Sequence, residues 1–565
     1  MHPMPANAHL SRRLPFLKWP RPTGQLLHSE IFAGLSVGLM VIPQGVAYAT
    51  LAGMPLITGI YASLLPALVA VLFSASSRLS VGPTALTAML VSASLNGMAT
   101  PGSAEWVNLA VWLSLLSGLL QIVLGFAGFG WLLNLVSSPV LMAFTQGAAV
   151  LILSSQLPAL LGLTQGWSSG LDPASWNLPS LLFGLATLAV LLIAKRLKPT
   201  FPTVLLVVVG SAALSWTLGL EAQGIPLVGE LPQGLPALYL PQGLDWETLK
   251  QLVLPALVIT LVSFLETASS AKVDNERKGQ HWDQNQDLIG QGLGKLASAL
   301  CGAFPTSSSF SRSALNLYAG AQTAWATVFS VFVILLSLLL FTPVLHHVPQ
   351  SVLSAIVVAA VLGLLKPQAF VRLLKINRVE GGISLLTFGI TLASAPRLYW
   401  GVLAGVVMGL SHFLHTRLHP RIIEVGLHPD GSLRDRHLWQ LPPLAPHLYA
   451  LRMDAELDFA AASNFERTIT DHLAQHPDTR HVCLFAQPIN RIDATGVEAF
   501  AQLQKQLIGR GITLHISGIK LPVEKVLQQA GELLPGLLLY RTDADALQAL
   551  RQLAPLPDDI GAASI

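Results

Sequence analysis

The sequence is poor in charged residues. Only 11% of its 565 residues are Asp, Glu, Lys or Arg, whereas 52% are hydrophobic, and the mean hydropathy is +0.58. Soluble domains carry about 25% charged residues, so this composition excludes an ordinary soluble protein and predicts one embedded in a lipid bilayer. The net charge is +3 and the Lys and Arg residues are scattered, so we expect no nucleic-acid partner.

Cysteine is almost absent, because Cys301 and Cys483 are the only two. Two cysteines so far apart exclude a disulfide or zinc framework. The sequence also lacks a glycine-rich phosphate-binding loop and a nucleophile elbow. We therefore predict no enzymatic activity, cofactor or bound metal. The first apolar run, 31–53, is long enough to span a bilayer and no cleavage site follows it, so we expect no signal peptide.

Long apolar stretches fill the chain between residues 30 and 420. A helix needs about 20 apolar residues to cross the hydrocarbon core. No charged residue occurs from Ile31 to Ser77, which predicts two spans with a turn near Met54 and Pro55. Twelve further spans are expected near 80–90, 106–128, 131–155, 178–196, 201–219, 250–272, 286–303, 308–320, 323–345, 350–366, 381–395 and 398–415.

Lys and Arg fall almost entirely on one side of this arrangement. With fourteen spans and a cytoplasmic N-terminus, the outer loops receive only Lys250 and Arg397. The cytoplasmic loops receive Arg78, Lys195, Arg196, Lys198, Lys272, Arg277, Lys278, Lys366, Arg372, Lys375 and Arg378. This bias predicts a multi-pass protein of the plasma (bacterial inner) membrane with both termini in the cytoplasm.

Two charges stand alone in the apolar sequence. Glu266 follows an uncharged run, 251–265, and Arg312 lies between the uncharged runs 296–311 and 313–365. A charge at membrane depth costs about 2.5–3.5 kcal/mol, so each is a functional-site hypothesis. The alternative is a structural ion pair, either between these two residues or with Lys295. The residues after Lys272, 274–278, are interpreted as a solvated loop.

Proline interrupts two of the predicted spans in a similar way. Pro83 precedes Thr84 and Ala85, and Pro305 precedes a run of Thr and Ser, 306–309. Each segment can end an extended stretch and begin a short helix, whose first N–H groups are free to meet an anion. The segments occupy the same place in two sets of seven spans, which favours inverted repeats with both short helices aimed at one midplane spot. Capping of its own helix is an equal alternative for Thr84, Ser308 and Ser309.

The first span carries a second polar pair. Pro43 is expected to interrupt it, and Gln44 and Tyr48 follow one turn apart on one helical face. Contact with a substrate and ordinary hydrogen bonding between helices explain this pair equally well.

The composition changes after residue 421. Short apolar runs at 448–453, 481–486, 512–518 and 536–540 alternate with helical patterns at 461–475, 495–509, 521–530 and 543–552. This alternation predicts a small α/β domain. The predicted divisions are a cytosolic segment 1–29, a transport domain 30–420, a linker 421–440, the α/β domain 441–555 and a tail 556–565.

The residues resemble the SulP family of sulfate-permease-type anion transporters with a C-terminal STAS domain. The matching segments are 42–66, 77–90, 264–316 and, for the STAS domain, RIDATGVEAF at 491–500. The resemblance implies an α-helical polytopic membrane protein of fourteen spans in two inverted repeats of seven. A core domain would move against a gate domain, in a homodimer, and a cytosolic STAS domain would follow.

The resemblance also implies a site. Its substrate-binding residues would be Gln44, Tyr48, Thr84, Ala85, Ser308, Ser309, Phe310, Ser311 and Arg312. Glu266 matches the acidic position that the family uses for ion coupling, and Ser270 is the second predicted ion-coupling residue. If the coupled ion is sodium, Ser308 would bind it together with Glu266 and Ser270. Lys295 departs from the small or amide residue expected there, and we interpret it as structural, with its stem reaching toward the inner surface. Thr495 replaces a serine that is phosphorylated in stand-alone STAS proteins; capping of its helix is the favoured interpretation.

The expected function is secondary active transport of a small inorganic or carboxylate anion, such as sulfate, bicarbonate or a dicarboxylate. We favour symport with protons through an elevator-type movement. The alternatives are sodium coupling, exchange or channel-like conduction, and a membrane receptor that signals through the STAS domain to a cytosolic partner.

Overall fold

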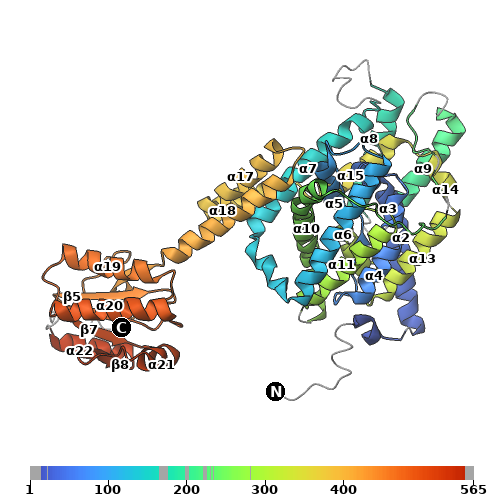
Figure 1. Ribbon diagram of the computed structural model, residues 1–565. Helices are drawn as coiled ribbons and strands as arrows, with labels where there is room; N and C mark the ends of the chain where they lie inside the picture. Colours follow the sequence, from blue (N-terminus) through green and yellow to red (C-terminus); the bar gives the residue numbers. More distant parts are fainter. Residues whose placement is uncertain are drawn as a thin grey trace. The chain divides into compact units, whose positions relative to one another are not determined.

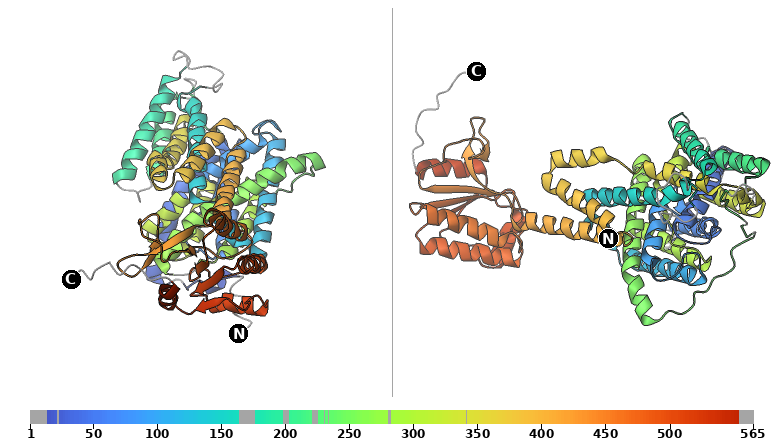
Figure 2. Two further views of the ribbon diagram at one scale, coloured as in Figure 1. Left: turned by 90° about the vertical axis from the view of Figure 1, so that its left-hand side faces the viewer. Right: turned by 90° about the horizontal axis from the view of Figure 1, so that it is seen from above.

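The computed structural model describes residues 14–21, 23–163, 176–197, 203–220, 225–229, 231–232, 234–279, 282–340 and 342–553. The chain divides into two compact units, Met1–Gly409 and Leu410–Ile565, each visible in Figures 1 and 2. Lys198, residues 1–13 and the predicted tail, 556–565, lie outside the described residues.

The first unit is helical. Its helices are α2 (Gly24–Leu51), α3 (Thr58–Tyr61), α4 (Leu65–Phe73), α5 (Ala85–Leu95), α6 (Ala104–Phe126), α7 (Ser138–Leu160), α8 (Leu178–Leu197), α9 (Thr203–Leu218), α10 (Trp246–Lys278), α11 (Gln284–Leu300), α12 (Phe310–Tyr318), α13 (Trp325–Leu340), α14 (Thr342–His346), α15 (Gln350–Leu362), α16 (Pro367–Ile376), α17 (Arg378–Ala393) and α18 (Tyr399–Leu418).

Several of these helices can cross a membrane. Five stretches are long and apolar enough by length and composition alone: Leu26–Leu51, Ala104–Phe126, Ser138–Leu160, Trp246–Ala271 and Gln350–Ile376. Shorter apolar helices, among them α5 and α13, lie between them in the sequence. The helical membrane class is therefore confirmed, while the number of fourteen spans stays a prediction. Helix α16 was not predicted, because its Arg and Lys residues break the apolar run after α15.

Helix α2 corrects one expectation, since it continues through Pro43 from Gly24 to Leu51. A proline removes one backbone hydrogen bond, which a helix tolerates when its neighbours support it. Here α2 packs closely on α3, because a Cβ built on Gly45 would lie 2.7 Å from the carbonyl oxygen of Gly59. Pro43 therefore does not interrupt the predicted first span.

Glu30 fixes α2 to α13. Its carboxylate is fully buried and accepts hydrogen bonds from the backbone N–H groups of Gln322 (2.8 Å), Thr323 (2.9 Å) and Ala326 (2.8 Å). The first N–H groups of a helix have no partner within it, so a carboxylate placed there stabilises the helix.

The two proline-interrupted segments form a small sheet. Strand β1 (Val81–Gly82) pairs antiparallel with β2 (Ser307–Ser308), so that Val81 faces Ser308 and Gly82 faces Ser307. Helix α5 follows β1 and α12 follows β2. Segments more than 200 residues apart are thus joined where each short helix begins.

The predicted loop 274–278 is also corrected, because α10 continues to Lys278. Asp274 is buried and its carboxylate forms an ion pair with Arg78. Asn275 is buried as well, and its Nδ2 donates to Ser76 Oγ at 3.2 Å. These polar residues lie inside because they meet partners from the segment between α4 and β1.

The second unit is an α/β domain with a six-stranded sheet in the order β4-β3-β5-β6-β7-β8. The strands are β3 (Ile422–Leu427), β4 (Leu433–Asp435), β5 (Leu448–Met453), β6 (His481–Phe485), β7 (Thr513–Ser517) and β8 (Leu538–Tyr540). The helices are α19 (Ala462–Gln475), α20 (Ala494–Gly509), α21 (Leu521–Gln529) and α22 (Asp543–Leu553). Strands β5 to β8 are parallel and correspond to the four predicted strands. Helices α19, α20 and α21 pack into one core of this domain, and α22 packs into a second one.

The predicted linker 421–440 is instead part of this sheet. Strand β3 pairs antiparallel with β5, and β4 pairs with β3. Ile423 and Val425 alternate with more exposed neighbours and lie in the core, as in a half-buried strand. Between β3 and β4, Pro429-Asp430-Gly431 forms a turn, with Gly431 at φ +82°.

Candidate functional site

The candidate site lies where α5 and α12 begin. Thr84 is the N-cap of α5, and its Oγ1 accepts from the backbone N–H of Thr87 at 3.3 Å. Ser309 is the N-cap of α12, and its Oγ accepts from the backbone N–H of Arg312 at 3.5 Å. The capping alternative is therefore realised for Thr84 and Ser309. Both helix starts are held together by the β1–β2 pair.

Arg312 is fully buried and points toward β1. Its Nη1 donates to the backbone oxygen of Pro83 at 2.9 Å, and its Nε donates to Ser80 Oγ at 3.3 Å. Its Nη2 has no hydrogen-bond partner among the described residues. Within these residues Arg312 forms no ion pair with Glu266, so the structure does not realise the alternative of a structural pair between them. The guanidinium ties α12 to the residues on either side of β1, and its Nη2 group has no partner among the described residues.

Glu266 reaches the start of α5 from α10. Its Oε2 accepts from Thr84 Oγ1 at 3.2 Å and lies 3.5 Å from Thr87 Oγ1. Thr87 was missed from the sequence, although a threonine in the first turn of a short helix beside an N-cap was a usable signal. The Ser270 hydroxyl donates to the backbone oxygen of Glu266 at 3.1 Å. This hydrogen bond lies within α10, so the hydroxyl does not donate to the Glu266 carboxylate.

The polar pair of α2 also faces this region. Gln44 is buried, and its Oε1 has no hydrogen-bond partner among the described residues. Tyr48 is buried one turn later, and α2 packs against both α5 and α12. Gln44 thus makes no hydrogen bond to a neighbouring helix through this oxygen, which favours the ligand alternative for it.

Four buried polar atoms that lack a partner among the described residues belong to this region. They come from α2, β2 with its preceding turn, and α12, and comprise Gln44 Oε1, Thr306 Oγ1, Ser308 Oγ and Arg312 Nη2. Each such atom costs about 1–3 kcal/mol when it stays unpaired, so native proteins normally satisfy them with a ligand or water. The group contains both donors and acceptors, which suits a small polar ligand.

Three predicted residues have different surroundings. Ala85 is buried in the first turn of α5, so only its backbone N–H can serve a ligand. Phe310 is 57% exposed, and Ser311 is exposed with its hydroxyl 3.3 Å from that of Ser309. They line the accessible side of the α12 N-terminus rather than the buried cluster.

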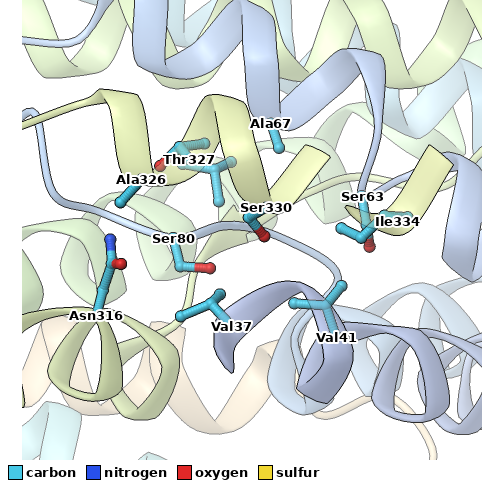
Figure 3. A pocket seen from close by; sticks show the side chains of 11 residues that line it. Val37, Val41, Ser63, Ala67, Ser80, Asn316, Ala326, Thr327, Ser330 and Ile334 are labelled. Atoms are coloured by element: carbon cyan, nitrogen blue, oxygen red, sulfur yellow. The ribbon is translucent and has the colours of Figure 1, made fainter. Parts of the chain in front are cut away.

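A small cavity is lined by residues of α2, α4, α12, α13 and the start of β1 (Figure 3). Its volume is about 10 Å³, close to the space that one water molecule needs. Ser80, Ser330 and Asn316 are among its lining residues, and Asn316 Oδ1 is buried without a partner. The cavity is too small for a transported oxyanion, so it is not the candidate site itself.

Lys295 is placed differently from the prediction. Its side chain is 0% exposed and does not reach the surface. The ammonium Nζ donates to Ser263 Oγ at 2.6 Å and to Gln121 Oε1 at 2.7 Å. The ammonium therefore stays buried because it binds polar groups of two neighbouring helices, α6 and α10.

Thr495 is exposed on α20 and is not the cap of that helix. Asp493 is the N-cap, and its Oδ1 accepts from the backbone N–H of Gly496 at 2.8 Å. The Asp493 Oδ2 also accepts from the N–H of Phe459 at 2.9 Å. The capping interpretation of Thr495 was wrong because a stronger cap lies two residues before it. Modification of Thr495 stays a prediction.

The geometry describes a helical membrane protein with discontinuous helices around a buried polar site. A model of the "Sulfate permease family" matches residues 27–387, and a STAS domain model matches residues 443–546. Because the first match covers more than half of the chain, the chain belongs to the sulfate permease family, a family of membrane anion transporters, and it carries a STAS domain.

Curated relatives agree with this membership. "Probable sulfate transporter 4.2" of Arabidopsis thaliana is 32% identical over 95% of this chain and 83% of its own length. "Probable sulfate transporter MT1781" of Mycobacterium tuberculosis is 30% identical over 93% of this chain and 96% of its own.

Solved structures share the fold. Murine solute carrier 26 family member A9, in the inward-facing state, has a TM-score of 0.84 over 98% of this chain and 96% of its own, at 20% identity. The transmembrane domain of the cyanobacterial bicarbonate transporter BicA has a TM-score of 0.59 over 69% of this chain and 99% of its own, also at 20% identity.

Proposed function

We propose that this chain is a secondary active transporter that carries a small oxyanion, sulfate in the first place, in symport with protons. The observation that carries the proposal is the cluster of unpartnered buried atoms between Gln44, Thr306, Ser308 and Arg312. The printed names of the curated relatives support sulfate, and bicarbonate is the next candidate because BicA shares the fold.

The site offers an anion three kinds of attraction. Helices α5 and α12 start at the strand pair, and each N-terminus contributes about 0.3–2 kcal/mol toward a negative charge. The free Nη2 of Arg312 adds a charged donor, and charge-assisted hydrogen bonds are roughly twice as strong as neutral ones. Hydroxyl groups such as that of Ser308 complete the set of donors.

Glu266 suits proton coupling because hydroxyl groups surround its carboxylate. The hydroxyls of Thr84 and Thr87 can donate to a carboxylate and can also accept from a carboxylic acid, so both protonation states keep partners. Arg312 donates to Ser80 and Pro83, which flank β1, and not to Glu266, so protonation of Glu266 would not act by releasing Arg312 from an ion pair. We place the coupling instead at Thr84, which touches Glu266 and caps the helix that faces the anion.

The remaining features belong to the same proposal. The core domain would move as an elevator against the gate domain, in a homodimer in the plasma membrane with cytoplasmic termini. The STAS domain would act on rate or assembly through a cytosolic partner. The proposed transport domain is 30–420, and the proposed STAS domain includes β3 and β4, so it begins before residue 441.

Reconstitution into proteoliposomes tests the function. We expect accumulation of radiolabelled sulfate under an inward proton gradient and competition by unlabelled oxyanions. Uptake that equilibrates without accumulation would identify an exchanger or a channel-like conductor. Tight sulfate binding with no flux in any gradient would favour the receptor alternative.

A further inference from the structure

Lys295 is a second buried cation near the site, and the function proposed above does not use it. Helix α11 presses against α6 at this point, because a Cβ built on Gly118 would lie 2.9 Å from the Lys295 Cβ. Ser114 Oγ also donates to the backbone oxygen of Lys295 at 2.9 Å. The packed helix pair therefore fixes the position of the side chain, which is 0% exposed.

Two neutral oxygen atoms hold the ammonium, Ser263 Oγ and Gln121 Oε1. The Gln121 amide is oriented by Thr260, whose backbone oxygen accepts from Nε2 at 3.3 Å, so the amide oxygen faces Lys295. No carboxylate forms an ion pair with Lys295 in the part of the chain that the structure describes. A buried ammonium is costly, so its retention without a carboxylate partner calls for a role beyond packing.

The position of the ammonium relative to Glu266 indicates that role. Ser263 and Glu266 are three residues apart on α10 and share one helical face. Lys295 donates to Ser263 and, among the described residues, makes no hydrogen bond or ion pair to Glu266. Its ammonium therefore lies about one helical turn from the acidic residue of the site.

We propose that Lys295 is a tethered cation that takes, beside Glu266, the position a co-transported sodium ion would otherwise take. Amide and hydroxyl oxygens are ligands that hard cations prefer, and here both are occupied by the ammonium. The inference rests on the proposed transport function and sharpens it: transport by this chain is independent of sodium, and Glu266 has only the proton to exchange.

Sulfate uptake by the full-length protein in proteoliposomes tests this, with sodium or choline as the external cation. Wild-type uptake is expected to differ less than twofold between the two media. Lys295→Ala removes the ammonium and leaves the two oxygens and space for an ion. We expect its uptake to fall at least tenfold in choline and to recover severalfold in sodium.

Two matched variants complete the design. Lys295→Met removes the charge but fills the space, so its uptake should stay low in both media. Lys250→Gln changes an exposed lysine at the start of α10 and should behave as wild type. The monodispersity of each variant in detergent establishes that it is folded.

The outcomes separate the inference from the proposed function. If the wild-type protein takes up no sulfate in sodium and none in choline, the transport function itself is contradicted. Wild-type uptake that requires sodium overturns only the tethered cation, and this comparison needs no variant. Lys295→Ala uptake that is indifferent to sodium, whether high or low, overturns it as well.

Discussion

The two units of the molecule differ in how they satisfy buried polar groups. In the described residues of the second unit, every buried side-chain polar atom has a hydrogen-bond partner. His515, for example, lies between His481 (3.2 Å) and Tyr540 (3.1 Å) in the sheet. Among the described residues of the first unit, partners are missing at Gln44, Ser308 and Arg312 near the strand pair, and also at residues elsewhere, such as Gln146 and Ser215. Complete networks rigidify a domain, whereas the unpartnered donors and acceptors at the two helix starts are where we propose that a ligand binds.

We expect the largest effect from a substitution of Glu266 in the incomplete network of the first unit. Glu266→Gln mimics the protonated acid, so sulfate binding and exchange should persist while proton-driven accumulation is abolished. Glu247→Gln, at the exposed start of the same helix, is the control and should accumulate sulfate as wild type. Uptake of labelled sulfate against its gradient measures both. Continued accumulation by Glu266→Gln would remove Glu266 from the coupling mechanism.

Substitutions of Arg312 test whether its unpartnered Nη2 binds the anion. A hydrogen bond to a charged group contributes about 1.5–3 kcal/mol, so Arg312→Ala should weaken sulfate binding about 10- to 100-fold in titration calorimetry. Arg312→Lys should recover part of the affinity as a point charge without the planar fork. Ser80→Ala removes only a structural partner of Nε and should change affinity less than about threefold. Wild-type affinity in Arg312→Ala would leave the helix N-termini as the sole source of attraction.

The complete network of the second unit predicts a pH effect on stability. Burial lowers the pKa of His515 to about 4, below the usual 6.5. Between pH 6.5 and 4 the unfolded chain binds a proton that the folded domain does not, so the free energy of unfolding falls as the pH falls. The loss is about 3 kcal/mol over this window.

His515→Gln keeps hydrogen-bonding groups without titration and should flatten this dependence. Labelling of the buried Cys483 by a disulfide reagent that reacts at low pH, as a function of urea, reports unfolding of the domain in the full chain. An equally steep dependence in His515→Gln would assign the effect to other groups.

We expect the smallest effect from the comparison of Asp493 and Thr495 as caps of helix α20. Loss of an N-cap costs about 0.5–2 kcal/mol, so Asp493→Ala should destabilise the second unit by about 1 kcal/mol in the same unfolding experiment. Thr495→Ala should change it by less than about 0.5 kcal/mol, because the side chain is exposed and caps nothing. The reverse order would restore Thr495 as the cap.

Isolated charges and prolines revealed much of the site from sequence. A charge in a membrane helix is costly wherever it lies, so Glu266 and Arg312 stood out without knowledge of their contacts. Prolines mark discontinuous helices through local chemistry, which located the starts of α5 and α12. In the second unit, periodic strands and helices identified β5 to β8 for the same local reason.

Long-range contacts could not be predicted in this way. Arg312 binds the oxygen of Pro83, 229 residues earlier, and Lys295 binds Gln121, 174 residues earlier. The sequence next to Arg312 or Lys295 gives no indication of these distant partners. Strands β3 and β4 were missed because their turn resembles a linker until β5 provides a pairing edge.

The two-residue strands β1 and β2 also limit how the chain can change in length. In an antiparallel pair, a shift of one residue turns every side chain to the opposite face. Deleting or inserting one residue between Arg78 and Thr84 would therefore exchange the faces of Val81 and Gly82 against β2 and rotate the start of α5. A change in the length of this short segment therefore alters both helix starts at once.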